Sequence, residues 1–288
     1  MKFWQCLAML DMEELPTLAR HAEDLGFEGI TLGEHLITFA EQYEHYDYSK
    51  NSQIRWYPET HWPEPWVQIG ALSQVTTTLK FLNTLYVLPL RDPFHAAKLI
   101  STAANLCDGR LILGAGIGWQ KSEFELVGQN FHDRGKRTDE MLAVMKQLWT
   151  GESVTYQGDY YQFPALQMSP RLKHSLPICI GGFSEAALQR AARNDGWVGA
   201  QHEMDDIEKL IPALRHFREQ AGLPWESFEI ALGLYDNSEA NLERCRELGV
   251  TMLYREAFCD ENGMASTMTL DEKLRDMEQF AKQYIQQQ

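Results

Sequence analysis

Three short segments of the sequence carry residue types that suit chemistry on a bound ligand. The first is Gly33-Glu34-His35, which sets a carboxylate beside an imidazole directly after an expected strand. Histidine titrates near neutral pH, so His35 is the candidate for acid/base catalysis. A structural histidine, bonded to Glu34 or to the backbone, is an equally good interpretation, and the sequence leaves both open.

The second segment is Gly109–Trp119, an apolar run that continues into glycines at positions 114, 116 and 118. Glycines let a backbone approach a ligand closely while its amides donate hydrogen bonds. A dinucleotide-binding turn needs the spacing G-x-G-x-x-G and an acidic residue about 20 positions further on, at the end of a strand. The spacing here is G-x-G-x-G and the region near residue 138 is typical of a helix, which excludes that turn.

The third segment is Gly181-Gly182-Phe183-Ser184, which leads from an expected strand into a helix. The first turn of a helix offers unpaired N–H groups at the positive end of its dipole, and these bind anions. The segment therefore predicts a site for a phosphate group. An ordinary tight strand-to-helix turn is the alternative.

The elements that must position these segments form eight strand–helix units. The expected strands cover residues 3–9, 29–32, 81–88, 111–115, 177–180, 196–200, 228–234 and 250–254. Typical starts of the helices between and after them are Asp11 with Glu14, Asp92 before Pro93, Ser184, Ser238, and Thr269 with Glu272. A long insertion follows the second strand, and residues 151–164 are typical of a β-hairpin between the fourth helix and the fifth strand.

Eight alternating units predict an α/β fold, a closed (β/α)8 TIM barrel that spans residues 1–288 as a single domain. An open doubly wound sheet is the rival architecture. In a barrel, the active site is built from the segments that follow the strands. The three segments above would then meet at one mouth, together with Pro89-Leu90-Arg91 and Gln201-His202.

The insertion, residues 36–65, is dense in aromatic side chains: Phe39, Tyr43, Tyr46, Tyr48, Trp56, Tyr57 and Trp62. Long loops in compact domains are usually functional or disordered, and this composition argues against disorder. We expect either an apolar lid over a ring-shaped ligand or a satellite core or dimer contact.

Composition and charge exclude several classes of function. The net charge of −15 argues against a nucleic-acid surface, and no apolar run is long enough to span a membrane. The five scattered cysteines predict reduced thiols in a cytoplasmic protein. No metal-type His/Cys cluster, P-loop, nucleophile elbow or diagnostic carboxylate pair is present, so we expect an organic cofactor to carry the reaction.

At these positions the chain resembles the luciferase-like monooxygenase superfamily, the barrel oxidoreductases that use a flavin or a deazaflavin. The segments that carry the resemblance are Gly33-Glu34-His35-Leu36, Leu88 to Pro93 with Ala97-Lys98, Gly109 to Trp119 with Glu123-Phe124, Arg134-Gly135, Asp139-Glu140, Leu148 to Gly151, Tyr156-Gln157-Gly158, Ile180-Gly181-Gly182 and Asp195-Gly196-Trp197. Together they are specific for the superfamily, although no single one is.

The resemblance implies a barrel with insertions, often a homodimer, that binds FMN or the deazaflavin coenzyme F420 at the C-terminal ends of its strands. It is closer to the F420-dependent branch. The implied cofactor-binding residues are Glu34, Thr84, Leu85, Gly116, Gly118, Trp119, Gly181, Gly182, Phe183 and Ser184. The family also has a non-prolyl cis peptide at the end of its third strand, which alignment from Pro89 places at Thr84-Leu85. Some deazaflavin dehydrogenases have a catalytic Glu where this chain has Trp119, which argues against sugar-phosphate dehydrogenase chemistry.

The leading hypothesis is therefore an F420- or FMN-dependent oxidoreductase or monooxygenase that acts on a small organic substrate, with His35 as proton donor or orienting group. Hydride transfer is expected with F420 and oxygen activation with FMN. A flavin-binding relative without turnover is the second hypothesis. A cofactor-free lyase or hydrolase is the third, disfavoured by the missing carboxylates and metal ligands.

Overall fold

The computed structural model describes residues 1–39, 46, 54–256, 258–259 and 267–286. Parallel strands form its centre: β1 (Lys2–Cys6), β2 (Gly29–Leu32), β3 (Lys80–Asn83), β5 (Leu111–Gly116), β8 (Ile178–Gly181), β9 (Gly196–His202), β10 (Glu229–Leu234) and β11 (Met252–Arg255). Each pairs with its neighbour, and the pairing of β3 with β5 closes the ring. The predicted closed barrel is confirmed, and the open sheet is excluded.

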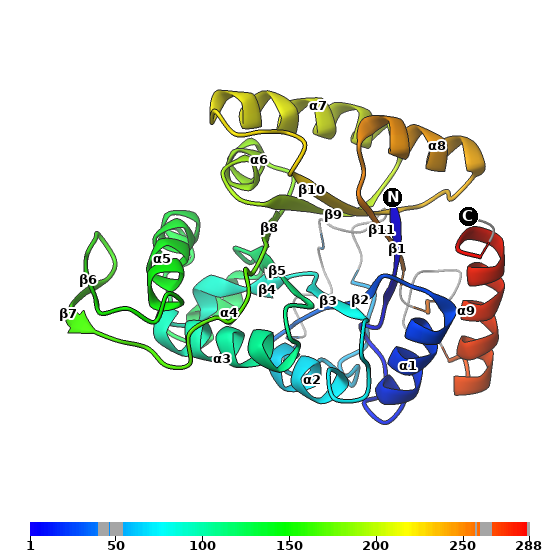
Figure 1. Cartoon of the computed structure of the whole chain (residues 1–288), viewed down its shortest axis with the longest axis horizontal. Helices are drawn as coiled ribbons and strands as arrows, with labels where there is room; N and C mark the ends of the chain where they lie inside the picture. The colour runs from blue at the N-terminus through cyan, green and yellow to red at the C-terminus, as the bar shows by residue number, and fades with distance from the viewer. Residues whose placement is uncertain (40–45, 47–53, 257, 260–266, 287–288) are drawn as a thin grey trace.

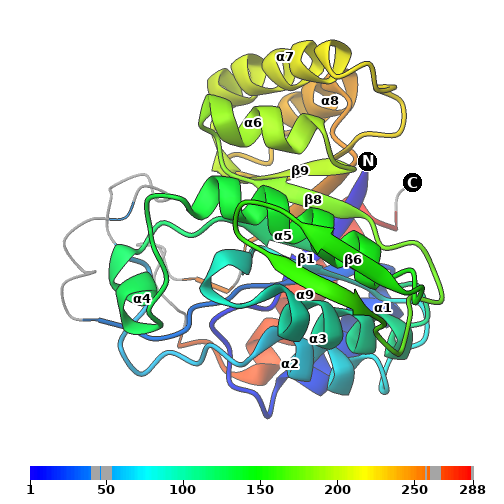
Figure 2. The same ribbon diagram turned by 90° about the vertical axis from the view of Figure 1, so that its left-hand side faces the viewer.

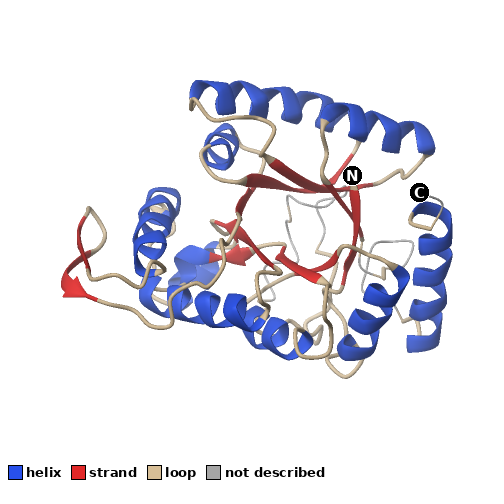
Figure 3. Ribbon diagram, in the orientation of Figure 1, coloured by secondary structure: helices blue, strands red, loops and turns tan. Residues whose placement is uncertain are grey.

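Helices surround the ring of strands on the outside (Figures 1 and 3). They are α1 (Leu15–Leu25), α2 (Pro65–Leu72), α3 (Pro93–Leu106), α5 (Arg134–Leu148), α6 (Glu185–Ala192), α7 (Met204–Gln220), α8 (Glu239–Leu248) and α9 (Leu270–Tyr284). Side chains alternate across a strand. In β3, for example, Phe81 belongs to the large core shared with the helices, whereas Leu82 packs with Trp4, Cys179 and Val198 from other strands.

Both predicted insertions interrupt this pattern. The one after β2 is described in part. The other is an antiparallel hairpin, β6 (Val154–Gln157) and β7 (Gln162–Leu166), which stands off from the barrel beside α5 (Figure 1). The carboxylate of Glu140 in α5 accepts the backbone N–H groups of Asp159, Tyr160 and Tyr161, and so ties the turn of the hairpin to that helix.

The third predicted strand, residues 81–88, is wrong as a single element. β3 ends at Asn83, a cis peptide joins Thr84 to Leu85, and the chain continues as β4 (Tyr86–Val87) and the 3-10 turn Leu88–Leu90. The ladder is interrupted at the cis bond and resumes as a pairing of β4 with β5. The position of the cis peptide, inferred from the family resemblance, is confirmed.

Two further predictions near the start of the chain are corrected. The first strand ends at Cys6 rather than at residue 9, and Asp11 does not cap the first helix. Residues 12–14 form a turn in which the Glu14 N–H donates to the Asp11 carbonyl, and α1 begins at Leu15. Pro16 explains the shift, because proline suits the first helical turn and not a position further inside.

Three of the other predicted helix caps are confirmed by a bond from the capping side chain to the first turn of the helix. Asp92 accepts from the N–H groups of Phe94 and His95, Ser184 caps α6, and Thr269 with Glu272 forms a capping box. Ser238 stands at the N-cap of α8 without a side-chain cap bond. One helix was not predicted: α4 (Lys121–Leu126), which lies at one end of the barrel, apart from the others (Figure 2).

None of the five cysteines forms a disulfide, and Cys107, Cys179 and Cys245 are buried. Within the residues that the structure describes, no helix is both long and apolar enough to cross a membrane. The same part of the chain holds no group of three or more side chains suited to a metal ion.

Candidate active site

His35 lies directly after β2, at the C-terminal mouth of the barrel, and is enclosed by aromatic rings. The ring centroids of Trp56, Trp62 and Trp119 lie 4.5, 4.9 and 5.9 Å from that of the imidazole. Tyr46 contacts both Trp56 and Trp119 at 5.2 Å. We call Tyr46, Trp56, Trp62 and Trp119 the aromatic enclosure. It leaves the His35 side chain 10% exposed, so the imidazole lies in a largely dehydrated setting.

The carboxylate of Glu123 lies beside His35, with Oε1 3.7 Å from Nδ1. That oxygen also accepts the backbone N–H groups of Leu36 at 2.9 Å and Ile37 at 3.4 Å. Glu123 thus binds the two peptide groups that directly follow His35. The bond between His35 and Glu34, considered for a structural histidine, is not formed among the recorded contacts.

Glu34 is engaged elsewhere. Its Oε1 lies 2.6 Å from Nη1 of Arg91 and accepts the N–H of Val87 at 3.3 Å, while Oε2 is buried without a partner. Burial raises the pKa of Glu34 to about 7, although Arg91 and the Val87 N–H act in the opposite direction. The guanidinium of Arg91 also lies 4.3 Å from the ring of Tyr86. Glu34 therefore braces the segment that follows the cis peptide.

The structure brings three of the predicted cofactor-binding residues, Thr84, Gly116 and Gly181, together around a fourth, Leu85. A Cβ atom at Gly181 would lie 1.9 Å from Cδ1 of Leu85, and one at Gly116 would lie 3.1 Å from its Cβ. The N–H of Thr84 donates to the Leu32 carbonyl at 2.7 Å. Gly116 and Gly181 thus admit the Leu85 side chain between β5 and β8. A side chain at position 181 would therefore clash with Leu85.

Gly118 and Gly182 have positive φ angles of 79° and 104°, which side-chain-bearing residues rarely adopt. At Gly182 the chain turns into α6, whose first intrahelical bonds run from Ala187 and Leu188 to the carbonyl of Ser184. The N–H groups before Ala187 have no acceptor within the helix. Trp197 of β9 donates its Nε1 hydrogen to the Gly182 carbonyl at 2.7 Å and fixes the turn, and Phe183 is exposed.

His202 is a second histidine at the mouth, at the end of β9. Its Nε2 accepts the N–H of Ala200 at 3.1 Å, and burial lowers its pKa, so that the ring is neutral at pH 7. Next to it, Gln201 accepts a bond of 3.3 Å from Arg55, which also pairs with Glu256 after β11. The insertion is therefore tied to the far side of the barrel.

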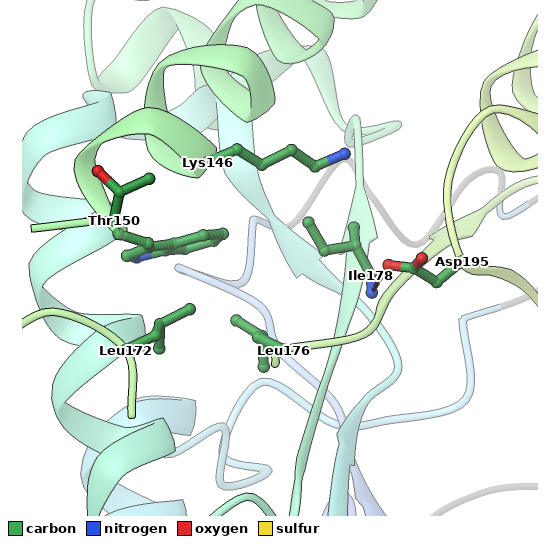
Figure 4. A pocket seen from close by; sticks show the side chains of 7 residues that line it. Lys146, Thr150, Leu172, Leu176, Ile178 and Asp195 are labelled. Atoms are coloured by element: carbon green, nitrogen blue, oxygen red, sulfur yellow. Dashed lines mark hydrogen bonds between the residues drawn. The ribbon is translucent and has the colours of Figure 1, made fainter. Parts of the chain in front are cut away.

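A pocket of about 260 Å³ lies at the opposite end of the barrel, where β8 begins (Figure 4). Trp149, Leu172, Leu176 and Ile178 form the apolar part of its wall. Its two charged side chains are both engaged: Lys146 donates to Asn194 at 3.0 Å, and Asp195 accepts the Ile178 N–H at 2.9 Å. We therefore assign the candidate active site to the mouth, where Nδ1 of His35 and Oε2 of Glu34 are buried without hydrogen-bond partners.

Reasoning from sequence missed Glu123 as a site residue. It appeared only within a family motif, because its helix was not predicted. A local signal was available: an acidic residue in the first turn after a glycine loop. The insertion was recognised by its aromatic content, and Trp56 and Trp62 confirm that it reaches the mouth, whereas Tyr43 and Tyr48 lie outside the described residues.

Known proteins resemble this chain along nearly its whole length. The model of the family described as Luciferase-like monooxygenase matches residues 7–279. An uncharacterized protein of Mycobacterium tuberculosis is 31% identical over 287 residues, 99% of each chain. The F420-dependent glucose-6-phosphate dehydrogenase of Amycolatopsis mediterranei is 26% identical over 81% of this chain and 68% of its own.

Relatives differ in cofactor and in reaction. The FMNH2-dependent dimethylsulfone monooxygenase of Pseudomonas fluorescens is 30% identical over 51% of this chain and 43% of its own. Among solved structures, the monooxygenase RslO1 of Streptomyces bottropensis superposes with a TM-score of 0.77 at 19% identity and covers 100% of this chain and 99% of its own. That likeness concerns the fold.

Proposed function

The chain belongs to the luciferase-like monooxygenase family, and we propose that it is an oxidoreductase that uses F420 or FMN at the C-terminal mouth of the barrel. The observation that carries the proposal is the meeting of two features at one mouth. His35 supplies an ionisable ring in the aromatic enclosure, and the turn before α6 supplies helix N–H groups for an anion.

The residues at the mouth fit a phosphorylated ring cofactor. Nδ1 of His35, Oε2 of Glu34 and the indole nitrogens of Trp56 and Trp62 are buried without hydrogen-bond partners, which is expensive unless a ligand or water satisfies them. When bound, F420 supplies hydride transfer and a reduced flavin supplies oxygen activation. We propose that Gly182, Phe183 and Ser184 hold the phosphate.

We propose the remaining cofactor-binding residues as two groups. Thr84, Leu85, Gly116 and Gly181 form the packed segment behind the ring, where the glycines admit Leu85. Glu34, Gly118 and Trp119 border it on the side of His35. His35 itself donates or orients a proton, and the enclosure excludes water from it. The substrate is a small organic molecule that enters next to these rings.

We propose F420 as the preferred cofactor, because the Gly33–Leu36 segment and the G-x-G-x-G-Trp loop resemble the deazaflavin branch. The deciding experiment is equilibrium binding of F420 and FMN to the apo protein, side by side. We expect the lower Kd for F420. Micromolar FMN binding without detectable F420 binding would reverse the assignment. FMN stays the alternative, because a chain with 26 basic against 41 acidic residues offers little surface for the polyanionic tail of F420. Binding of neither would refute the proposed function.

We also propose a homodimer that forms through α2 and α3. Val67 of α2 is 71% exposed, and Phe94, Leu99 and Leu106 of α3 are exposed as well. Exposed apolar side chains on two neighbouring helices are typical of an interface. Light scattering after gel filtration should give twice the chain mass, and Leu106→Glu should give the monomer. Cysteines that form no disulfide suit a cytoplasmic protein, and the continuous barrel suits a single domain over residues 1–288.

A further inference from the structure

We infer that Glu123 is a positioning residue for His35. Its carboxylate holds the imidazole as the tautomer with the proton on Nδ1 and so leaves Nε2 to accept or, once protonated, to donate a proton. The inference rests on the proposed role of His35 at the mouth.

The local sequence places Glu123 against the His35 segment. After β5 the chain turns at Gly118, where a Cβ atom would lie 2.8 Å from both Val87 and Phe124. The turn lets α4 fold back over the mouth, and Phe124 is fully buried beneath it. Glu123 precedes Phe124 in the first turn of α4, where the helix dipole favours a negative charge.

The carboxylate of Glu123 is fixed from one side by peptide groups. Its side chain is 3% exposed, and Oε1 accepts the N–H groups of Leu36 and Ile37. Within the described part of the chain, His35 is the only basic side chain within 4 Å of this carboxylate. A buried carboxylate is stabilised by donors and positive charge, and in the described residues the His35 ring can supply both.

The imidazole of His35 likewise needs a hydrogen-bond partner. Its Nδ1 is buried and has no partner within hydrogen-bond distance. The surrounding indoles of Trp56, Trp62 and Trp119 donate only, so they offer Nδ1–H no acceptor. Oε1 of Glu123, at 3.7 Å, is the nearest recorded acceptor, a few tenths of an ångström beyond a bond. A small rotation forms a charge-assisted hydrogen bond, which selects the Nδ1–H tautomer.

This tautomer is measurable in the intact protein without substrate or cofactor. Long-range 1H–15N correlation spectra of the 15N-histidine-labelled chain, taken at alkaline pH where imidazole is neutral, distinguish a protonated ring nitrogen from a bare one. The signals lost in His35→Gln identify the ring. We expect Nδ1 of wild-type His35 to carry the proton, the opposite of the form that free histidine prefers.

Removal of the charge tests the carboxylate itself. Glu123→Gln keeps an oxygen that accepts the Leu36 and Ile37 N–H groups but has no negative charge. Since a bond to a charged acceptor is the stronger one, we expect the ratio of the Nδ1–H to the Nε2–H tautomer to fall about tenfold. Glu125→Gln is the matched control, because that residue is exposed on the same helix and pairs with Lys121. It should leave the ratio unchanged.

Two results overturn the inference. One is a wild-type His35 with its proton on Nε2, which requires no variant and decides the matter if Glu123→Gln does not fold. The other is an unchanged tautomer in a folded Glu123→Gln. A merely structural Glu123 would alter the Leu36 and Ile37 amide signals and leave the imidazole as it was. Failure of both cofactors to bind would refute the proposed function without moving this tautomer.

Discussion

The two halves of the barrel mouth differ in chemistry. The half from β2 to β5 holds His35, Glu123 and the ion pair of Glu34 with Arg91, all largely enclosed. The half from β8 to β9 offers the backbone turn at Gly182 and a neutral His202. Ionisable groups in a dehydrated setting suit proton transfer, whereas helix N–H groups suit phosphate. The difference teaches that reaction and anchoring can be assigned to two neighbouring groups of strands, which meet where β5 pairs with β8. Separate variants should therefore change turnover and affinity separately.

The largest effect is expected on turnover, from a variant in the first half of the mouth. His35→Ala should lower kcat by about 10²–10⁴ and change cofactor Kd little, because a general acid or base contributes in the transition state. Steady-state kinetics with a verified substrate measure kcat, and titration with the cofactor measures its Kd. His95→Ala, on the exposed face of α3, is the control. Near-wild-type turnover in His35→Ala would show that His35 is structural. The first half would then have no catalytic role to set against the anchoring role of the second.

A second large effect is expected on the free energy of unfolding, through the packing of β3 against β5. A Cβ atom at Gly114 of β5 would lie 1.8 Å from the backbone oxygen of Asn83, which no rotamer change can relieve. Gly114→Ala should lower the free energy of unfolding by about 3 kcal/mol. Gly70→Ala in α2 meets only ordinary contact at 3.7 Å and should be neutral or stabilising by up to about 1 kcal/mol. Denaturant titrations compare them, and equal midpoints would contradict the packing described for β3 and β5.

In the first half, Glu34 should make stability depend on pH. Burial raises the pKa of Glu34 from 4.5 to about 7, so the folded chain keeps a proton that the unfolded chain releases. Between these values the folded state binds more protons, and stability falls as pH rises, by up to about 3 kcal/mol. Glu34→Gln should remove this part of the slope, and Glu125→Gln should not. Unfolding measured from pH 4.5 to 7.5 tests it. The same slope in Glu34→Gln and wild type would show that Glu34 ionises normally.

The smallest effect is expected on affinity from the second half. Gly182→Val places a branched side chain at a φ of 104°, with its Cβ 3.0 Å from Ala187, in front of the α6 N–H groups. Kd for the phosphorylated cofactor should rise about tenfold, a loss of about 1.4 kcal/mol, and Kd for a riboflavin-like analogue should rise less. Gly222→Val, also at positive φ in open space, is the control. An equal loss of affinity for the phosphorylated cofactor and the riboflavin-like analogue would show that this turn does not hold the phosphate.

The barrel was predictable because its signals are local. Asp92, Ser184 and the pair Thr269 and Glu272 mark helix starts through bonds within one turn, and the glycines mark strand ends. The Glu123–His35 contact was not predictable, because it joins residues 88 positions apart through a short helix whose periodicity is too brief to detect. The packing of Gly181 against Leu85 likewise depends on a closed ring.

The tie between Arg55, Gln201 and Glu256 has a consequence for protein engineering. The insertion that carries Trp56 and Trp62 follows β2. Its Arg55 is bonded to Gln201 near the end of β9, on the far side of the ring, and to Glu256 directly after β11. A graft of another family member's insertion onto this scaffold would break those bonds unless both acceptors were transplanted with it. An exchange of the insertion therefore has to move the segments around Gln201 and Glu256 with it, as one unit.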